Sequence, residues 1–397
     1  MPFLYDVVVV GGCGRVGLPL AIAFAETGSR VAVLDLDEHA VKLVNDAVLP
    51  FAEAGAQPLL ERAVDAQRLH ATTDPSVVAD AESVIVVIGT PVDEHLNPDP
   101  RSIVRALAGC SAHFRDGQQL VLRSTIYPGV TAQVERMVRD LGVQVDVSFC
   151  PERIAEGRAM TELFALPQIV GARTEQARQR ASALFGRLTG TIVDLDPEEA
   201  ELAKLFTNSW RYIKFAAANQ FFMTANDRGL DFERIRQAVV QDYPRAADLP
   251  GAGFAAGPCL LKDTMQLAAF NNNNFALGHS AMQVNEGLPL YLVAGLQSRY
   301  DLSRMTVGIL GMAFKAGSDD TRASLSYKLK RILEFTAERV LCTDPHVTTD
   351  ASLLPLEQVL AESDLLVLAT PHGEYAGLQP TVPVADVWGF LAPAHPS

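Results

Sequence analysis

The chain enters its first regular segment with Tyr5-Asp6-Val7-Val8-Val9-Val10-Gly11-Gly12-Cys13-Gly14-Arg15-Val16-Gly17. The β-branched first half is typical of a buried parallel strand. The glycines form a G-x-G-x-x-G pattern, and a helical pattern follows from Leu18 to Glu26. Glycines at this spacing allow a tight turn, the close approach of a pyrophosphate and close packing of helix on strand. The segment therefore predicts a dinucleotide site made by Gly12, Cys13, Gly14, Arg15, Val16 and Gly17.

The next predicted strand, 30–34, ends at Asp35. This carboxylate comes about 20 residues after the glycines, where the acid that binds a ribose is expected. It would accept hydrogen bonds from the ribose hydroxyls and repel a 2′-phosphate. The sequence therefore favours NAD over NADP.

Three further predicted strands each end at a polar side chain. They are 83–88 before Thr90, 119–122 before Thr125, and 145–149 before Glu152. In a doubly wound sheet, ligands bind outside the carboxyl ends of the strands. One such residue alone is more often a turn residue or a cap, but three of them indicate a crevice shared with the dinucleotide.

The composition describes a folded chain with more than one domain. Its 397 residues exceed the usual size of one core, and 48% hydrophobic with 20% charged residues is typical of globular proteins. The net charge of −14 argues against nucleic acid or an anionic membrane as a partner. No apolar run reaches the length of a membrane span, and the five scattered cysteines lack metal-ligand spacing. We expect a cytoplasmic protein with reduced thiols and no metal.

A long helix is predicted in the middle of the chain, over 198–226. A proline precedes it, and no glycine or proline interrupts it. Lys204, Asn208 and Arg211 share one face of this helix. We expect Arg211 to be solvated, whereas Lys204 and Asn208 have apolar neighbours and are candidates for a cleft. A second helix, 276–297, leads towards the last part of the chain.

A loop of small residues, 253–258, precedes Cys259. Small residues let backbone N–H groups approach a ligand closely. If a helix begins at Leu260, Cys259 and Asp263 lie one turn apart on one face. A thiol at the positive end of a helix dipole is also easier to ionise. An isolated cysteine is more often an inert core residue, so this segment alone leaves both interpretations open.

A second α/β unit begins at 305–311, and its strand ends resemble those of the first. One of its predicted strands ends at Asp344. Only Gly311 stands where the first unit has three glycines, so we expect a Rossmann-like fold that does not hold a dinucleotide in the same way. Lys315 and Arg322 could meet phosphates, although two cations in a loop are more often surface residues.

The order of these segments resembles the UDP-glucose/GDP-mannose dehydrogenase family, which oxidises the C6 alcohol of a nucleotide sugar to a carboxylate. The resemblance runs from Val7 to about Leu391. Besides the glycine fingerprint and the Cys259/Asp263 segment, its motifs are Ser124-Thr125-Ile126-Tyr127-Pro128-Gly129, Pro151-Glu152-Arg153-Ile154-Ala155-Glu156-Gly157, Ala200-Glu201-Leu202-Ala203-Lys204-Leu205-Phe206-Thr207-Asn208, Gly311-Met312-Ala313-Phe314-Lys315 and Asp319-Asp320-Thr321-Arg322.

The resemblance implies an α/β fold with two Rossmann-like doubly wound domains joined by a central helical domain with one long helix. The implied domains are an NAD-binding domain (1–196), a central dimerisation domain with the cysteine (197–300) and a nucleotide-sugar-binding domain (301–397). It also implies a homodimer.

The resemblance further implies roles for individual residues. Cys259 matches the nucleophile, and Glu152 matches the general acid/base. The groups that polarise the reacting centre and a water are matched by Lys204, Asn208 and Asp263. The residues near NAD are matched by Thr90, Thr125, Glu156 and Arg322, and a substrate contact is matched by Lys315. Thr125 also belongs to the implied catalytic set, and Glu152, Lys204 and Asn208 to the implied substrate contacts. Gly253 and Phe254 belong to the implied substrate loop. Arg245 looks like the arginine that the family lends to the neighbouring subunit's nucleotide sugar.

The chain departs from the family pattern at two places. The family usually has two adjacent glycines before the cysteine, whereas here Ala256 precedes Gly257 and Pro258 removes a donor. A frequent Asn-Glu pair in the long helix is replaced by Asn219-Gln220. The motif around Glu152 looks more like the N-acetylhexosamine branch than the glucose branch.

The implied reaction is a four-electron oxidation that uses two NAD molecules in turn, through a thiohemiacetal and a thioester on Cys259. Three alternatives remain open from the sequence, and the least favoured of them is a structural partner protein. A two-electron hydroxyacid dehydrogenase would not need Cys259. A non-catalytic NAD-responsive binding protein would need neither Lys204, Cys259 nor Asp263.

Overall fold

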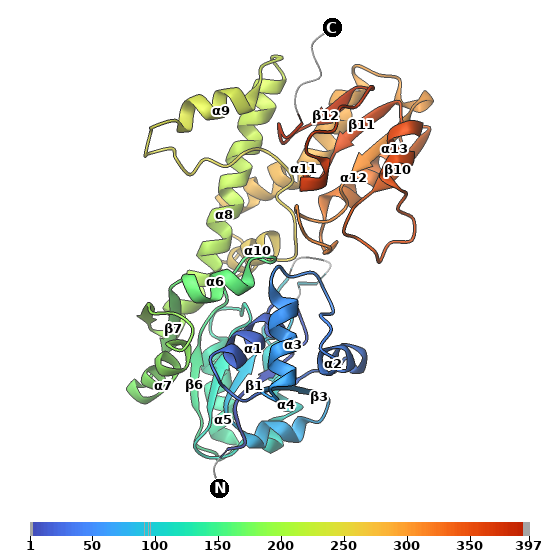
Figure 1. Ribbon diagram of the computed structural model, residues 1–397. Helices are drawn as coiled ribbons and strands as arrows, with labels where there is room; N and C mark the ends of the chain where they lie inside the picture. The colour runs from blue at the N-terminus through green and yellow to red at the C-terminus, as the bar shows by residue number, and fades with distance from the viewer. Residues whose placement is uncertain (1–2, 91, 94, 96, 392–397) are drawn as a thin grey trace. The chain divides into compact units, whose positions relative to one another are not determined.

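The computed structural model describes residues 3–90, 92–93, 95 and 97–391 (Figure 1). Pro91, the last residue of the motif that contains Thr90, lies outside the described residues. The chain forms two compact units, Met1–Thr207 and Asn208–Ser397. None of the described helices is both long and apolar enough to cross a membrane.

The first unit is built on an eight-stranded sheet in the order β3-β2-β1-β4-β5-β6-β7-β8. All neighbouring strands are parallel except β6 and β7. The strands are β1 (Tyr5–Val10), β2 (Val31–Leu34), β3 (Leu69–Thr72), β4 (Ala81–Val86), β5 (Gln119–Leu122), β6 (Asp146–Phe149), β7 (Gln168–Ala172) and β8 (Ile192–Leu195). The order reverses direction between β1 and β4, and this switch point is where a doubly wound sheet binds its ligand.

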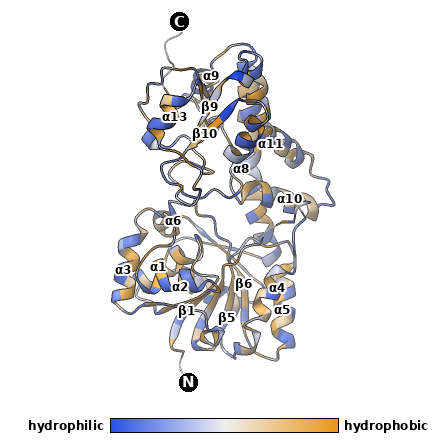
Figure 2. Ribbon diagram, turned by 90° about the vertical axis from the view of Figure 1, so that its right-hand side faces the viewer, coloured by the Kyte–Doolittle hydropathy of each residue, from blue (hydrophilic) through white to orange (hydrophobic). Residues whose placement is uncertain are grey.

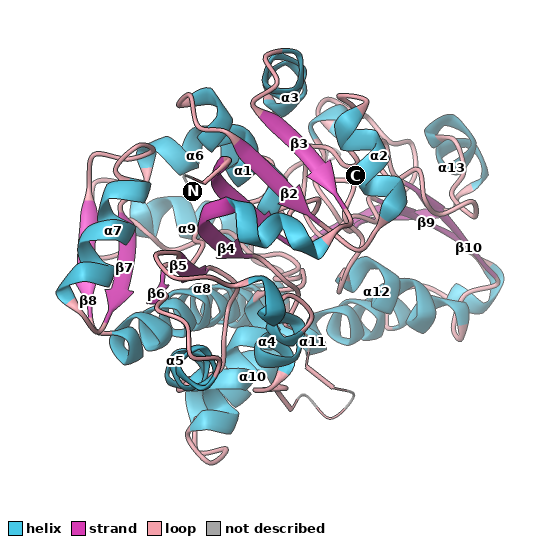
Figure 3. Cartoon of the chain, turned by 90° about the horizontal axis from the view of Figure 1, so that it is seen from below, coloured by secondary structure: helices cyan, strands magenta, loops and turns pink. Residues whose placement is uncertain are grey.

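Helices cover both faces of this sheet, as Figure 3 shows for α1 and α3 on one side and α4 and α5 on the other. The helices are α1 (Gly17–Glu26), α2 (Glu38–Asn45), α3 (Ala56–Asp65), α4 (Ser102–Ala108), α5 (Val130–Asp140), α6 (Ala159–Ala165) and α7 (Glu175–Phe185). Each face has its own hydrophobic core, in which side chains such as Phe24 and Phe185 or Ile103 and Val134 are fully buried. Hydrophobic colouring accordingly follows the strands, and the outer helices show both colours (Figure 2).

Close packing requires two of the three glycines of the fingerprint, Gly12 and Gly17. A Cβ on Gly12 would lie 2.6 Å from the carbonyl oxygen of Val9, and one on Gly17 would lie 2.6 Å from Cα of Gly12. Gly11 has a φ of +73°, a backbone conformation that residues with a side chain rarely adopt. Helix α1 can therefore start directly against the end of β1.

The second unit begins within the long helix α8 and ends in a parallel sheet in the order β10-β9-β11-β12. Its helices are α8 (Pro197–Asn226, whose first residues belong to the first unit), α9 (Phe232–Val240), α10 (Leu260–Phe270), α11 (Ala276–Gln297), α12 (Leu325–Glu334) and α13 (Leu356–Glu362), and its strands are β9 (Thr306–Leu310), β10 (Arg339–Thr343), β11 (Leu365–Leu368) and β12 (Val384–Asp386). The order again changes direction beside the first strand, here between β9 and β11. Two Rossmann-like sheets and a long central helix confirm the predicted fold class.

One predicted strand is shifted in the structure. The prediction was 83–88, whereas β4 spans Ala81–Val86. The N–H of Val87 still donates to the carbonyl of Val10 at 2.8 Å, but the N–H of Ile88 donates to the Ser124 hydroxyl at 2.8 Å in place of a strand carbonyl. An apolar run does not reveal such a side-chain bond.

Candidate active site

The turn after β1 is fastened by Asp35, which stands at the end of β2. One carboxylate oxygen of Asp35 accepts the N–H of Cys13 at 2.9 Å, and the other accepts the N–H of Asp37 at 3.2 Å. Burial and the nearby Asp35 and Asp37 raise the pKa of the Cys13 thiol to about 12. Cys13 therefore contributes its backbone, and its side chain is no candidate nucleophile.

The structure brings Glu156 to the glycine fingerprint. Its carboxylate pairs with the guanidinium of Arg15 at 3.1 Å, although the two residues are far apart in the sequence. Glu53 fixes the Glu156 loop, because its two oxygens accept the N–H groups of Gly157 and Ala159, each at 2.8 Å. Sequence reasoning missed Glu53, since nothing in its local pattern marks it.

Thr90 and Thr125 also lie together, at the ends of neighbouring strands. The hydroxyl of Thr90 donates to the backbone carbonyl of Thr125 at 2.7 Å. The loop after Thr125 is fastened by Glu201, which accepts the N–H and the hydroxyl of Thr131 at 2.9 and 2.6 Å. Glu201 is a second residue that the sequence analysis did not assign.

Both carboxylate oxygens of Glu152 are engaged. Oε2 accepts a hydrogen bond from the guanidinium of Arg123, and Oε1 accepts the N–H groups of Arg153 and Ile154 at 2.7 and 2.9 Å. Arg123 is itself 2% exposed and also donates to the carbonyl of Cys150 at 3.1 Å. To transfer a proton, Glu152 would have to release one of these bonds.

Cys259 stands at the start of α10, as the sequence predicts. It is the N-cap residue of that helix, and its carbonyl accepts the N–H of Asp263 at 2.9 Å. Cys259 is exposed, whereas Cys13, Cys110, Cys150 and Cys342 are buried. Of the five cysteines, Cys259 is therefore the one that solvent reaches.

Asp263 is completely buried and has two partners in the second unit. The amide nitrogen of Asn208 donates to its Oδ2, and the ammonium group of Lys262 lies 3.1 Å from its Oδ1. Lys262 is a further residue that sequence reasoning missed, although it directly precedes Asp263. Lys204 lies one turn before Asn208 on α8 and is 9% exposed, whereas Arg211 is exposed as expected.

The loop before Cys259 is clamped by Asn219 of α8. The amide oxygen of Asn219 accepts the N–H of Gly253 at 2.8 Å, and its nitrogen donates to the carbonyl of Gly253 at 3.0 Å. A Cβ on Gly253, whose φ is +148°, would lie 2.2 Å from the ring of Trp388. The Phe254 side chain is buried, so this residue can meet a ligand only through its backbone.

Three further cationic residues with predicted roles lie near the surface of the second unit. Arg322 forms a forked pair with Asp320, with a closest distance of 2.6 Å. The ammonium group of Lys315 lies 5.8 Å from the centre of the Phe314 ring. Arg245 is exposed and stacks over the ring of Tyr243 at 4.7 Å. None of these three contacts tests the predicted roles.

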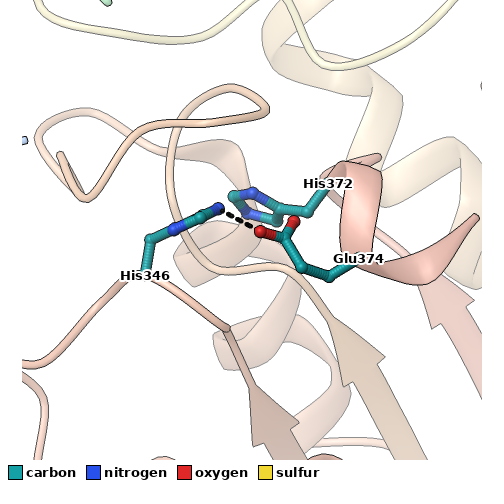
Figure 4. Close-up of side chains that lie close together, drawn as sticks. All are labelled: His346, His372 and Glu374. Carbon is teal, nitrogen blue, oxygen red and sulfur yellow. Dashed lines mark ion pairs between the residues drawn. The ribbon is translucent and has the colours of Figure 1, made fainter. Parts of the chain in front are cut away.

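Among the described residues, His346, His372 and Glu374 place possible metal ligands within 4.8 Å of one another (Figure 4). His346 faces Glu374, and the two form an ion pair at 3.1 Å when the histidine is protonated. Both ring nitrogens of His372 are already in use, because Nδ1 accepts the N–H of Gly317 and Nε2 lies 3.0 Å from Asp344. These internal bonds account for the cluster, and we assign it no metal.

Comparisons with known proteins match most of the chain. Three models of the UDP-glucose/GDP-mannose dehydrogenase family match, namely its NAD binding domain over residues 6–189, its central domain over 198–287 and its UDP binding domain over 308–392. The UDP-N-acetyl-D-mannosamine dehydrogenase of Pyrococcus horikoshii is 30% identical over 93% of this chain and 90% of its own length. The enzyme of the same name from Yersinia pestis is 28% identical over 95% and 96%.

Solved structures give the same picture. The UDP-D-ManNAc dehydrogenase of Pyrococcus horikoshii superposes with a TM-score of 0.88 at 28% identity, covering 94% of this chain and 91% of that one. A UDP-glucose dehydrogenase of Pyrobaculum islandicum gives a TM-score of 0.91 at 28% identity, with coverages of 97% and 94%.

Proposed function

Because this chain belongs to the UDP-glucose/GDP-mannose dehydrogenase family, we propose that its substrate is a UDP-N-acetylhexosamine, with UDP-N-acetyl-D-mannosamine as the first candidate. The chain is an NAD-dependent nucleotide-sugar dehydrogenase, and the reaction is the four-electron oxidation of the C6 alcohol to the acid. The choice of sugar is supported by the curated relatives named UDP-N-acetyl-D-mannosamine dehydrogenase.

The residues of the first unit fit NAD. Gly12 and Gly17 leave no room for a Cβ, and Asp35, which follows β2, is partly exposed. We assign NAD binding to Gly12, Cys13, Gly14, Arg15, Val16, Gly17, Asp35, Thr90, Thr125, Glu156 and Arg322. When bound, NAD accepts a hydride in each of the two oxidations.

We assign the covalent step to Cys259. Its sulfur would add to the intermediate aldehyde and form a thiohemiacetal, whose oxidation gives a thioester that water hydrolyses to the acid. This proposal is supported by the exposure of Cys259 at a helix N-terminus, where a thiolate is stabilised. The tether would also retain the aldehyde between the two oxidations.

The remaining catalytic roles go to groups beside the reacting carbon. Lys204 and Asn208 would stabilise the oxyanion, a contribution of about 3–4 kcal/mol for one such donor. Asp263 would orient the hydrolytic water, Glu152 would move protons once it releases a hydrogen bond, and Thr125 would complete the catalytic set. For the nucleotide sugar we propose Glu152, Lys204, Asn208, Gly253, Phe254, Lys315 and the partner subunit's copy of Arg245.

The proposed assembly is a homodimer formed through α8. The helix exposes Phe206, Trp210 and Phe221 by 53%, 56% and 53%, and their spacing places them along one stripe. Large exposed apolar side chains in a row are typical of protein interfaces. We also propose the division into an NAD-binding domain (1–196), a central domain (197–300) and a nucleotide-sugar domain (301–397). A cytoplasmic location is in keeping with five widely scattered cysteines, and we propose no nucleic acid or membrane partner.

A substrate panel tests the proposed sugar. Initial rates of NADH formation are measured with UDP-N-acetylmannosamine, UDP-N-acetylglucosamine, UDP-glucose, UDP-galactose and GDP-mannose. We expect kcat/KM to be highest for one of the two UDP-N-acetylhexosamines. A higher value for UDP-glucose or GDP-mannose would contradict the assignment to the N-acetylhexosamine branch.

A further inference from the structure

The second unit contains a His–Asp pair whose side chains have no exposed surface, His372 and Asp344. Asp344 directly follows β10, and His372 follows β11 in the run Ala369-Thr370-Pro371-His372. A buried polar pair is costly unless all its hydrogen bonds are made. The partners of this pair therefore indicate what it does.

Asp344 binds the beginning of the loop that follows β9. Its Oδ2 accepts the N–H groups of Met312 and Ala313 at 2.6 and 2.9 Å, and it also accepts from Nε2 of His372 at 3.0 Å. The hydroxyl of Thr370 donates to the carbonyl of Ala313 at 2.6 Å. The first residues of the loop are thus fastened to the ends of β10 and β11.

His372 binds the same loop farther along. Its Nδ1 lies 3.2 Å from the N of Gly317, which donates. An imidazole nitrogen that accepts a hydrogen bond carries no proton, so the proton of the neutral ring is on Nε2, where Asp344 accepts it. The network thus defines one tautomer, and the pair spans the loop from Met312 to Gly317.

The loop that follows β9 contacts the segment before Cys259. The ring of Phe314 lies over Gly257, where a Cβ would be 2.6 Å from the nearest ring atom. The N–H of Gly257 donates to the carbonyl of Ala323, at the far end of the loop, at 3.2 Å. Gly257 stands two residues before Cys259, and Lys315 follows Phe314. One loop therefore carries Lys315 and supports the segment that presents the thiol.

The first unit has the equivalent acid without the histidine. Asp35 likewise accepts a backbone N–H of the turn after the first strand, that of Cys13 at 2.9 Å. The segment Thr90-Pro91-Val92, however, has a valine where Thr370-Pro371-His372 has the histidine. The bonds of His372 to Asp344 and Gly317 are therefore an addition of the second sheet to a turn that both acids fasten.

We propose that His372 is a positioning residue that, through Gly317 and Asp344, fixes the loop 311–323 for nucleotide-sugar binding and for presentation of Cys259. The inference rests on the proposed function in one respect, the assignment of Lys315 to the nucleotide sugar. His372 touches neither substrate nor cofactor in this account.

Two conservative variants separate the two bonds of His372. In His372→Asn the side-chain oxygen can take the place of Nδ1 and accept from Gly317, whereas in His372→Gln the amide nitrogen can take the place of Nε2 and donate to Asp344. We expect His372→Gln to raise KM for the nucleotide sugar on the order of tenfold, the effect of one lost hydrogen bond. KM for NAD should rise less than KM for the sugar, because Arg322 is the one proposed NAD contact in this loop, and His372→Asn should restore most of the sugar KM.

The matched control is His346→Gln, because His346 lies beside His372 with ring centroids 4.9 Å apart but is bound to Glu374. It should leave both KM values as in the wild type. Equal increases in KM for sugar and NAD in His372→Gln, or a sugar KM as in the wild type in that folded variant, would overturn the proposal.

An experiment that needs no turnover distinguishes a failure of this proposal from a failure of the proposed function. Hydrogen exchange in peptides covering 311–323, and the rate of Cys259 alkylation, are measured on the full chain without substrate. Faster exchange and an altered alkylation rate in His372→Gln, with values near wild type in His372→Asn, support the anchor even if no sugar is oxidised. Identical exchange in all three proteins would refute it.

Discussion

At the scale of single residues, environment separates one cysteine from the other four. Burial is the largest influence that raises the pKa values of Cys13, Cys150 and Cys342, in each case to about 12, and it also raises that of Cys110. Thiols of this kind stay protonated at neutral pH and react slowly. Cys259 is exposed at the start of α10.

Thiol titration tests this difference. We expect a disulfide reagent at pH 8 to modify one thiol of the native protein rapidly and all five after denaturation. Cys259→Ser should remove the rapid phase and leave the slow ones. A rapid phase that persists in this variant would show that another cysteine is reactive.

Arg123 and Glu152 form a buried ion pair, in which the two side chains are only 2% and 11% exposed. Removing one member of a buried ion pair leaves the other charge unpaired, which costs about 3–5 kcal/mol. We expect Arg123→Met to lose this much free energy of unfolding in urea denaturation, and Arg123→Met with Glu152→Gln to recover part of it. Equal losses in the single and double variants would contradict the pairing.

Asp344 predicts a pH dependence of stability. Burial alone would raise the pKa of its carboxyl, but hydrogen bonds from His372 and from backbone N–H groups outweigh burial and hold this pKa well below its usual value. A carboxyl with a depressed folded pKa stabilises the fold above its unfolded pKa of about 3.9, and the contribution is lost as the pH falls through the folded pKa.

Asp344→Asn should therefore be less stable than wild type at pH 7 by about 1.5–3 kcal/mol, the range for hydrogen bonds to a charged group. The difference should shrink as the pH falls below about 4. Urea unfolding at pH 7 and at pH 3.5 measures it. A difference that grows on acidification would reverse the sign and reject the interpretation.

At the scale of elements, the loop between α9 and α10 shows why the departure from the family pattern is tolerated. Gly257 has a φ of +100° and lies under the Phe314 ring. Ala256 is partly buried and is not among the residues with positive φ. The single retained glycine thus stands where the backbone and the ring require it.

Two substitutions compare these neighbouring positions. Gly257→Ala would force its Cβ against Phe314 and strain the backbone, which costs on the order of 1–3 kcal/mol, so we expect activity to fall about tenfold or more as Cys259 moves. Ala256→Gly, which restores the two adjacent glycines, should keep activity within about twofold, since substitutions at partly exposed positions usually change the free energy of unfolding little. Steady-state rates decide, and equal rates in both variants would contradict the argument.

The sequence predicts elements better than contacts. The strand 119–122 and the helix 276–297 are found with the predicted bounds, because periodicity and turn residues are local signals. The bonds of Glu53 and Glu201 join residues 104 and 70 positions apart. Such pairings depend on the folded arrangement, and no local pattern carries them.

At the scale of the whole molecule, the chain applies one architecture twice for different purposes. In the first unit, three glycines open the turn after β1, and Asp35 remains partly exposed beside it. In the second unit, the side chain of the equivalent acid, Asp344, has no exposed surface and is bound to His372. The absence of the full glycine pattern predicted that the second sheet would not hold a dinucleotide in the same way. The bond of His372 to this acid could not be predicted, since a single histidine after a strand is an ordinary residue.

The central claim is that the thiol of Cys259 carries the second oxidation, from the aldehyde to the acid. The most direct test supplies a limiting amount of the preferred nucleotide sugar with excess NAD and counts the NADH formed per sugar. The account predicts two NADH per sugar and a uronic acid for the wild type, and no acid from Cys259→Ala, which should still bind NAD. Two NADH per sugar from Cys259→Ala would contradict it.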